Sequence, residues 1–90
     1  ALAAECLKVI AHPQRLFLLN LLDEAELTVG DLAERCGIPS HMASEHLRLM
    51  MRCGLLKVRA EGQRRIYSIS EGHVRTILNC VRERFIEPRV

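Results

Sequence analysis

The sequence predicts a small, mainly α-helical domain of the α+β class with a single β-hairpin. Apolar residues recur at helical spacing over residues 2–53, and a last apolar stripe follows at about 71–86. Between them, two runs rich in β-forming residues, 55–60 and 64–69, flank the turn sequence Glu61-Gly62-Gln63. The expected order is ααααββα. Two short helices joined by a turn and followed by a hairpin are typical of a winged helix-turn-helix domain.

Length and composition fit one globular domain, residues 1–90. Hydrophobic residues make up 49% of the chain and charged residues 27%, which excludes a disordered or collagen-like protein. A chain of this size buries roughly 60–65% of its surface on folding, so association with a second copy would add useful stability. No apolar run approaches the ~20 residues that cross a bilayer, and no signal peptide opens the chain, so we expect a cytoplasmic protein.

The net charge of +2 hides an uneven distribution along the chain. Residues 1–47 hold three Lys or Arg against seven acids, whereas residues 48–90 hold ten against four. A basic half on a nearly neutral chain suggests an anionic partner that meets one side of the molecule. The alternative is an ordinary solvated charged surface.

The first half of the chain predicts a helical core. Helical spacing of apolar residues predicts a first helix over residues 2–10, and Pro13 suits the first turn of a second helix over 13–24. That second helix is apolar almost all round, so we expect it to be the central core helix.

The helix-turn-helix is expected at about 28–53. Thr28 followed by Asp31 resembles a capping box that opens a short helix, and Gly37 ends it. The chain then restarts as a helix at about residue 40.

This second helix of the pair has two different faces. At 100° per residue its apolar side chains, with Ala43 and Leu47 among them, fall on one arc. The opposite arc carries the candidate DNA-contacting residues Ser40, His41, Ser44, Glu45, Arg48 and Arg52. Small hydroxyl groups near a helix N-terminus allow close approach to a duplex, and that end also attracts phosphate.

The roles on this face divide by chemistry. His41, Ser44 and Glu45 could reach base edges, and Glu45 is best suited to accept from a cytosine amino group. Arg48 and Arg52 suit phosphates. The alternative for Glu45 is an ion pair with one of these two arginines. His46 points toward the apolar arc, so we expect a buried, hydrogen-bonded packing residue and not a ligand.

The hairpin, at about 55–69, would form a cationic wing. Gln63, Arg64 and Arg65 lie at its tip, backed by Lys57 and Arg59. An arginine-tipped ribbon can follow the DNA backbone or enter a narrow minor groove. The alternative is an ordinary charged loop tip.

With these features, the chain resembles the ArsR/SmtB family of winged-helix repressors. The resemblance rests on three segments that together span nearly all of the chain: "LKVIAHPQRLFLLNLL", "ELTVGDLAERCGIPSHMASEHLRLM" and "GLLKVRAEGQRRIYSISEGHV". It implies a homodimer paired through the first and last helices, about 2–10 and 71–86. It also implies two reading helices in successive major grooves of double-stranded DNA and a repressor that an inducer releases.

The same resemblance bears on the inducer. Members that sense thiophilic metals often carry cysteine in "ELCVGDL", whereas this chain has Thr28 at that position. Zinc and cobalt sensors use Asp-x-His in the last helix, then His, then His or Glu. Here the pattern reads Glu71, His73, Arg84 and Glu87, and a guanidinium cannot ligate a cation. We therefore expect no zinc at this site.

Thiol chemistry is the remaining candidate for the inducer site. The four cysteines, Cys6, Cys36, Cys53 and Cys80, contain no CxxC pair, which argues against a zinc ribbon or a thioredoxin-type motif. Cys6 and Cys80 fall on the two helices that the resemblance places at the dimer interface, and His73 lies two helical turns before Cys80. These residues could bind a soft metal ion or oxidise. The alternative is that all four thiols are small buried hydrophobic residues.

Two other classes of function compete with a repressor. A winged-helix protein-interaction module could use the Glu45 face to recognise a basic peptide. An enzyme is not expected, because no nucleophile, base and orienting group fall together and no glycine-rich phosphate loop is present.

Overall fold

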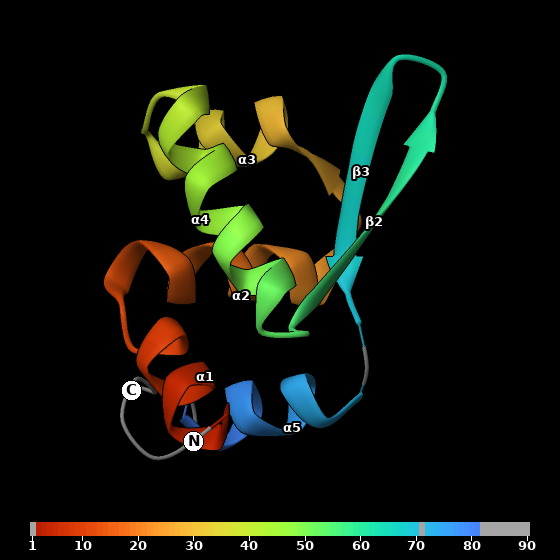
Figure 1. Cartoon of the computed structure of the whole chain (residues 1–90). Coiled ribbons are helices and arrows are strands. Elements are labelled where there is room, and N and C mark those ends of the chain that lie inside the picture. The colour runs from red at the N-terminus through yellow and green to blue at the C-terminus, as the bar shows by residue number, and fades with distance from the viewer. Residues whose placement is uncertain (1, 71, 82–90) are drawn as a thin grey trace.

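The computed structural model describes residues 2–70 and 72–81, and it confirms the winged helix-turn-helix (Figure 1). Its helices are α1 (Leu2–Ile10), α2 (Pro13–Glu24), α3 (Val29–Cys36), α4 (Ser40–Arg52) and α5 (Gly72–Val81). Its strands are β1 (Leu27–Thr28), β2 (Leu56–Glu61) and β3 (Arg64–Ile69). The hairpin of β2 and β3, here called the wing, projects beyond the helices, while α1 and α5 lie together at the opposite end (Figure 1).

Two helices begin at a capping side chain; the sequence predicted the Thr28 cap of α3 but not the His12 cap of α2. His12 caps α2, because its Nδ1 atom accepts from the Gln14 backbone N–H at 3.2 Å. Thr28 caps α3, with its Oγ1 atom accepting from the Asp31 backbone N–H at 3.1 Å. Gly37 ends α3 in the left-handed conformation, with φ of 73°, which a residue without a Cβ atom adopts without strain.

The sequence did not predict β1. These two residues pair antiparallel with β3, Leu27 opposite Tyr67 and Thr28 opposite Ile66, so the sheet order is β1-β3-β2. The observed element order is therefore ααβααββα and not ααααββα. A strand of two residues has no periodicity to detect, and only its pairing with β3 defines it.

The turn of the wing is shorter than predicted. Glu61 pairs with Arg64 in the sheet register, so Glu61 belongs to β2 and only Gly62 and Gln63 form the turn. Gly62 has φ of 64°, which fits a type II′ hairpin turn with glycine at its first central position. This tight turn fixes the register of the residues beside it, including Arg64 and Arg65.

The core forms where α2 meets the helix-turn-helix and the base of the sheet. The largest fully buried side chains are Leu18, Leu19, Leu22, Leu32, Leu47, Met50 and Leu78. Helix α2 supplies three of them, as expected of a central helix. It is not buried on all sides, because the Phe17 side chain is 45% exposed.

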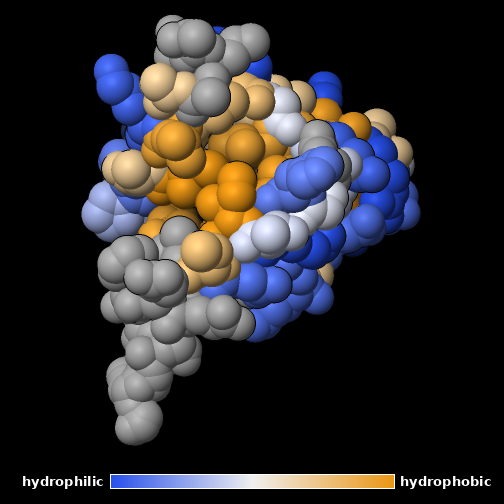
Figure 2. Space-filling model, turned by 90° about the horizontal axis from the view of Figure 1, so that it is seen from below, coloured by the Kyte–Doolittle hydropathy of each residue, from blue (hydrophilic) through white to orange (hydrophobic). Residues whose placement is uncertain are grey.

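A second apolar area lies on the surface. Figure 2 shows apolar side chains gathered on the face that α1 and α5 form at the lower end of the molecule. Leu7 of α1 is 56% exposed and Ile77 of α5 is 37% exposed. The last helix was expected over 71–86, of which residue 71 and residues 82–86 lie outside the described part of the chain. Over the residues described, no helix combines the length and apolar character that a membrane span requires.

Candidate nucleic-acid interface

The two predicted faces of α4 are present in the structure. Ala43, Leu47 and Met50 are completely buried. On the other side, Ser44 is partly buried and the remaining predicted contacts are exposed: Ser40, His41, Glu45, Arg48 and Arg52. Helix α4 is therefore seated on the core by one side and offers its polar side to solvent. We call α4 the reading helix.

An open hollow of about 430 Å³ joins the reading helix to the wing. Ser44 and Arg48 enter it from α4, and Arg65 enters it from β3. Its apolar lining consists of Val29, Met51, Val58 and Tyr67. In the described part of the chain neither Arg48 nor Arg65 has an ion pair, so two uncompensated guanidinium groups border one hollow.

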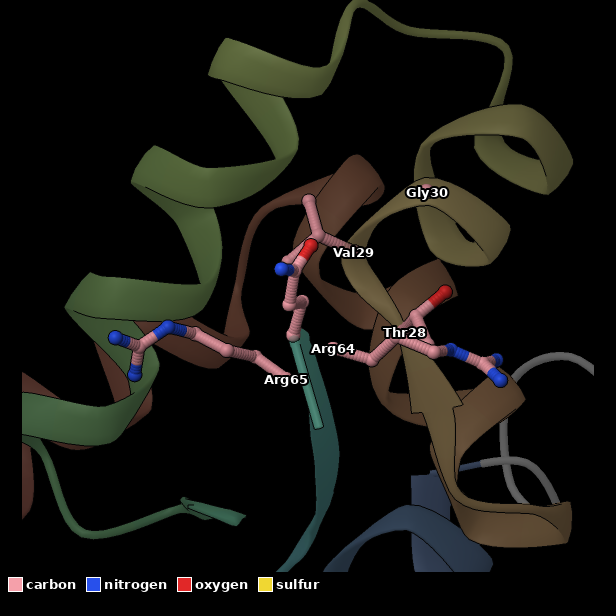
Figure 3. A pocket seen from close by; sticks show the side chains of 6 residues that line it. Thr28, Val29, Gly30, Arg64 and Arg65 are labelled. Carbon is pink, nitrogen blue, oxygen red and sulfur yellow. The ribbon is translucent and has the colours of Figure 1, made fainter. Parts of the chain in front are cut away.

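Arg64 and Arg65 point to opposite sides of β3 (Figure 3). The Arg65 side chain extends toward α4, whereas the Arg64 side chain passes Thr28 on the other side of the strand. Successive side chains of a strand alternate in this way. Arg64 and Arg65 both border a second open hollow of about 330 Å³, together with Gln63 and with Gly30 near the N-terminus of α3. The wing tip therefore offers cations in two directions, where the sequence suggested one cluster.

Arg59 differs from the other wing arginines. Its guanidinium makes ion pairs with Glu26 at 2.7 Å and with Glu61 at 3.5 Å. The hydrogen bond from Arg59 to Glu26 and the charge of that carboxylate raise the pKa of Arg59. The sequence grouped Arg59 with the cations that back the wing, but its charge is already balanced. Lys57 is exposed, as expected.

Glu45 does not form the local ion pair considered as its alternative role. Among residues 2–70 and 72–81, no ion pair joins its carboxylate to Arg48 or Arg52. Glu45 is exposed on the polar side of α4. Glu45 is therefore a negatively charged hydrogen-bond acceptor on the polar side of α4, where Arg48 and Arg52 are positively charged.

His46 has the role that the sequence predicted. It is partly buried on the core side of α4, and both ring nitrogens are within hydrogen-bond distance of side chains of α2. Nε2 lies 2.9 Å from Oε1 of Gln14, and Nδ1 lies 3.3 Å from Nη1 of Arg15. Burial lowers the pKa of His46, and the charges of His12 and Arg15 lower it further, while Glu45 acts in the opposite direction.

All four cysteines are free thiols, and one of them makes a contact that was not expected. The Cys6 thiol donates a hydrogen bond to the backbone carbonyl oxygen of Cys53 at 3.3 Å, a contact that the sequence did not suggest. Cys80 is exposed on α5. Cys36 is partly buried, and burial raises the pKa of its thiol. Burial therefore disfavours the thiolate form of Cys36.

The described residues contain no group of three or more His, Cys, Asp or Glu side chains that could hold a metal ion. His73 is exposed on α5. The other members of the degenerate last-helix pattern, Glu71, Arg84 and Glu87, lie outside the described residues.

Comparison with known proteins identifies the family. Residues 12–58 match the family described as bacterial regulatory protein, arsR family. The chain is 35% identical over 83 residues to the uncharacterized HTH-type transcriptional regulator Rv0081 of Mycobacterium tuberculosis, covering 91% of this chain and 73% of that protein. It is 33% identical to the transcriptional activator HlyU of Vibrio cholerae, covering 90% and 75%. It is 30% identical to the biofilm growth-associated repressor of Xylella fastidiosa, covering 87% and 68%.

Solved structures show the same similarity in three dimensions. HlyU from Vibrio cholerae superposes with a TM-score of 0.87 at 30% identity, covering 96% of this chain and 94% of that one. The homodimeric winged helix-turn-helix DNA-binding domain of Mb0332 from Mycobacterium bovis superposes with a TM-score of 0.84 at 31% identity, covering 89% and 74%. The chain therefore belongs to the arsR family of bacterial regulatory proteins, transcriptional regulators with a winged helix-turn-helix DNA-binding fold.

Proposed function

We propose that this protein is a homodimeric repressor that places its two reading helices in successive major grooves of an operator. The observation that carries the proposal is the hollow between α4 and the wing, where Arg48 and Arg65 have no carboxylate partner among the described residues. A duplex carries one phosphate charge per about 1.7 Å of its axis, so a groove bordered by uncompensated arginines fits its backbone. The names of the relatives include both a repressor and an activator. Repression is our proposal for this chain.

Each contact residue has a chemical role in this proposal. Ser40, His41, Ser44 and Glu45 face the base edges, because they lie on the exposed side of the N-terminal half of α4. The phosphate contacts come from the cations of α4 and from the wing tip: Arg48, Arg52, Gln63, Arg64 and Arg65. Phosphate contacts fix the register of the protein on the duplex, and base contacts select the sequence.

The dimer would form through the apolar face of α1 and α5. Leu7 and Ile77 expose large apolar surface there, and water contact with that surface is unfavourable. The relative from Mycobacterium bovis is described as homodimeric, which supports a dimer of this chain. A two-fold axis would pair the reading helices, so the operator is expected to be an inverted repeat.

The inducer that we propose acts on thiols, either as a thiol-reactive species or as a soft metal ion. Cys6 on α1 and Cys80 with His73 on α5 lie on the proposed dimerisation helices. Chemistry at these helices would change how the two subunits pair, and with it the spacing of the reading helices. This part of the proposal has its own test. Release of the operator by peroxide or by Cd²⁺ is compared between the wild type and the variants Cys6→Ser and Cys80→Ser.

The experiment that tests the proposal is titration of fluorescent duplexes with reduced protein, followed by anisotropy. A duplex selected from a random library should bind at least about 10³-fold more tightly than a scrambled duplex of the same length. Equal and weak binding to all duplexes would overturn the proposal. Binding of basic peptides without binding of DNA would instead support a protein-interaction module on the Glu45 face.

A further inference from the structure

Polar side chains meet where α1, α2 and the reading helix come together. His46 reaches from the core side of α4 to Gln14 and Arg15 of α2, at 2.9 Å and 3.3 Å. The Nε atom of Arg15 also donates to the backbone carbonyl oxygen of Val9, near the end of α1, at 2.6 Å. His46 therefore connects the reading helix to α2 directly and to α1 through Arg15.

These contacts define one protonation state of His46. A guanidinium can only donate, so Nδ1 of His46 must accept from Arg15. Nε2 then carries the proton and donates it to Oε1 of Gln14. This is the neutral imidazole in a single tautomer. A second proton, on Nδ1, would remove the acceptor and set a positive ring against the Arg15 guanidinium.

The reading helix has few other polar contacts with the rest of the fold. Within the described residues, His46 makes every side-chain hydrogen bond between residues 40–52 and another element, and the C-cap residue Cys53 accepts one from the Cys6 thiol. The N-terminus of α4 follows Pro39, and no side chain caps it. Apolar packing at Ala43, Leu47 and Met50 holds α4 on the core but is not directional. The hydrogen bonds of His46 supply a directional constraint on how α4 lies.

We propose that neutral His46 is a positioning residue that fixes the reading helix for operator binding, so that protonation of His46 weakens this binding. The inference rests on the proposed function, and it adds a residue that touches no DNA. The groups that face His46 are His12, with ring centroids 4.9 Å apart, Arg15, and Glu45 on its own helix. Two of these are basic, and burial also disfavours the charged ring, so the neutral form dominates near pH 7.

The expected effect has a definite size. If only the neutral form positions α4, the apparent Kd equals the intrinsic Kd divided by the neutral fraction. The Kd should therefore rise by up to about tenfold for each pH unit below the titration midpoint of His46.

The test compares the full chain with three variants on a selected duplex, at constant ionic strength, from pH 8 to pH 5.5. His46→Gln can accept from Arg15 and donate to Gln14 but does not titrate, so it should bind like the wild type at pH 8 and lose the low-pH weakening. His46→Ala should bind more weakly at every pH. His41→Gln, the matched control, should keep the weakening. NMR titration of the imidazole gives the midpoint against which each Kd profile is compared.

Several outcomes would overturn the inference. One is a low-pH weakening in His46→Gln equal to that of the wild type, and another is unchanged affinity in a folded His46→Ala. If circular dichroism shows His46→Ala to be unfolded, the profile of His46→Gln alone decides. Failure of the wild type to bind any duplex at pH 8 would refute the proposed function instead, and it is seen before any variant is compared. In that case, NMR of the α4 amide groups tests the positioning role without DNA. Chemical-shift changes that follow the titration midpoint of His46 in the wild type, and are lost in His46→Gln, would support that role. Their absence in the wild type would refute it.

Discussion

Arg48 of the reading helix and Arg65 of β3 border the same hollow, and in the described part of the chain neither guanidinium has a carboxylate partner. Two elements far apart in the sequence thus direct positive charge at one place. Arg59, on the neighbouring strand of the same wing, is paired with Glu26 and Glu61. The wing therefore separates into arginines available to an anion and one that is already neutralised.

This separation predicts different salt dependences for the wing variants. The slope of log K against log salt changes by about 0.9 for each phosphate that the protein no longer neutralises. Each substitution is present in both subunits of the proposed dimer and removes two phosphate contacts. Arg64→Ala and Arg65→Ala should therefore each weaken operator binding and flatten the slope by about twice that amount. Arg59→Ala removes the same formal charge but should leave the slope unchanged, because the Arg59 guanidinium is paired with carboxylates and neutralises no phosphate. Equal slopes for all three variants and the wild type would contradict the assigned role of the wing tip.

Glu45 predicts a change in sequence preference. Replacing it by Gln removes a negative charge from the reading face, so binding to unrelated duplexes should strengthen. The preference for a C·G pair at one operator position should weaken by about 1–3 kcal/mol, the worth of a good base contact. Competition assays with duplexes altered at single positions measure both effects. A preference that survives intact would mean that Glu45 does not contact a base.

The apolar face of α1 and α5 predicts the oligomeric state. Leu7→Glu and Ile77→Glu each place a charge on a surface expected to be buried between subunits, so the dimer should dissociate at micromolar concentration. Operator affinity should fall with it, because a monomer holds only one half-site. Sedimentation velocity measures the dissociation, and Ala60→Glu on the wing is the control that should remain dimeric. A dimer that persists in both interface variants would place the interface elsewhere.

The folding free energy should depend on pH through His46. An unperturbed histidine has a pKa of about 6.5 in the unfolded chain, and burial lowers the pKa of His46 in the fold. The unfolded chain therefore binds the proton more readily than the folded chain does. The contribution of neutral His46 to the free energy of unfolding is present above the unfolded pKa of about 6.5, and it is lost as the pH falls through the lower pKa of the folded state. Urea unfolding at pH 7.5 and pH 5.5 should show a larger loss for the wild type than for His46→Gln. The same loss in both proteins would remove His46 as the cause.

The sequence predicted those features that depend on local pattern. Gly37 and Pro13 mark helix boundaries through their backbone preferences, and Thr28 does so through its side-chain hydroxyl. All three mark the same boundaries in the structure. The polar arc of α4 follows from the helical period alone. His46 was predicted to pack on the core side because its angle on the helix wheel lies there, and its hydrogen bonds to α2 agree.

The features that could not be predicted from the sequence depend on contacts between distant segments of the chain. Strand β1 exists only through its register with β3. Arg59 meets Glu26, 33 residues away, because β2 and β1 flank β3 in one sheet. Cys6 meets the carbonyl group of Cys53, 47 residues away, through packing of α1 on the end of α4. None of these pairings leaves a periodic signal in the sequence. The divergence of Arg64 and Arg65, by contrast, could have been read from the alternation of side chains along a strand.

The most direct test of the central claim, that paired subunits present α4 and the wing to one duplex, is selection of binding sites from a random duplex library by the reduced protein. A dimer that binds in this way should enrich an inverted repeat whose half-site centres lie about 10–10.5 base pairs apart, the spacing of successive major grooves on one side of the helix. Absence of enrichment, or recovery of a single half-site without symmetry, would contradict it.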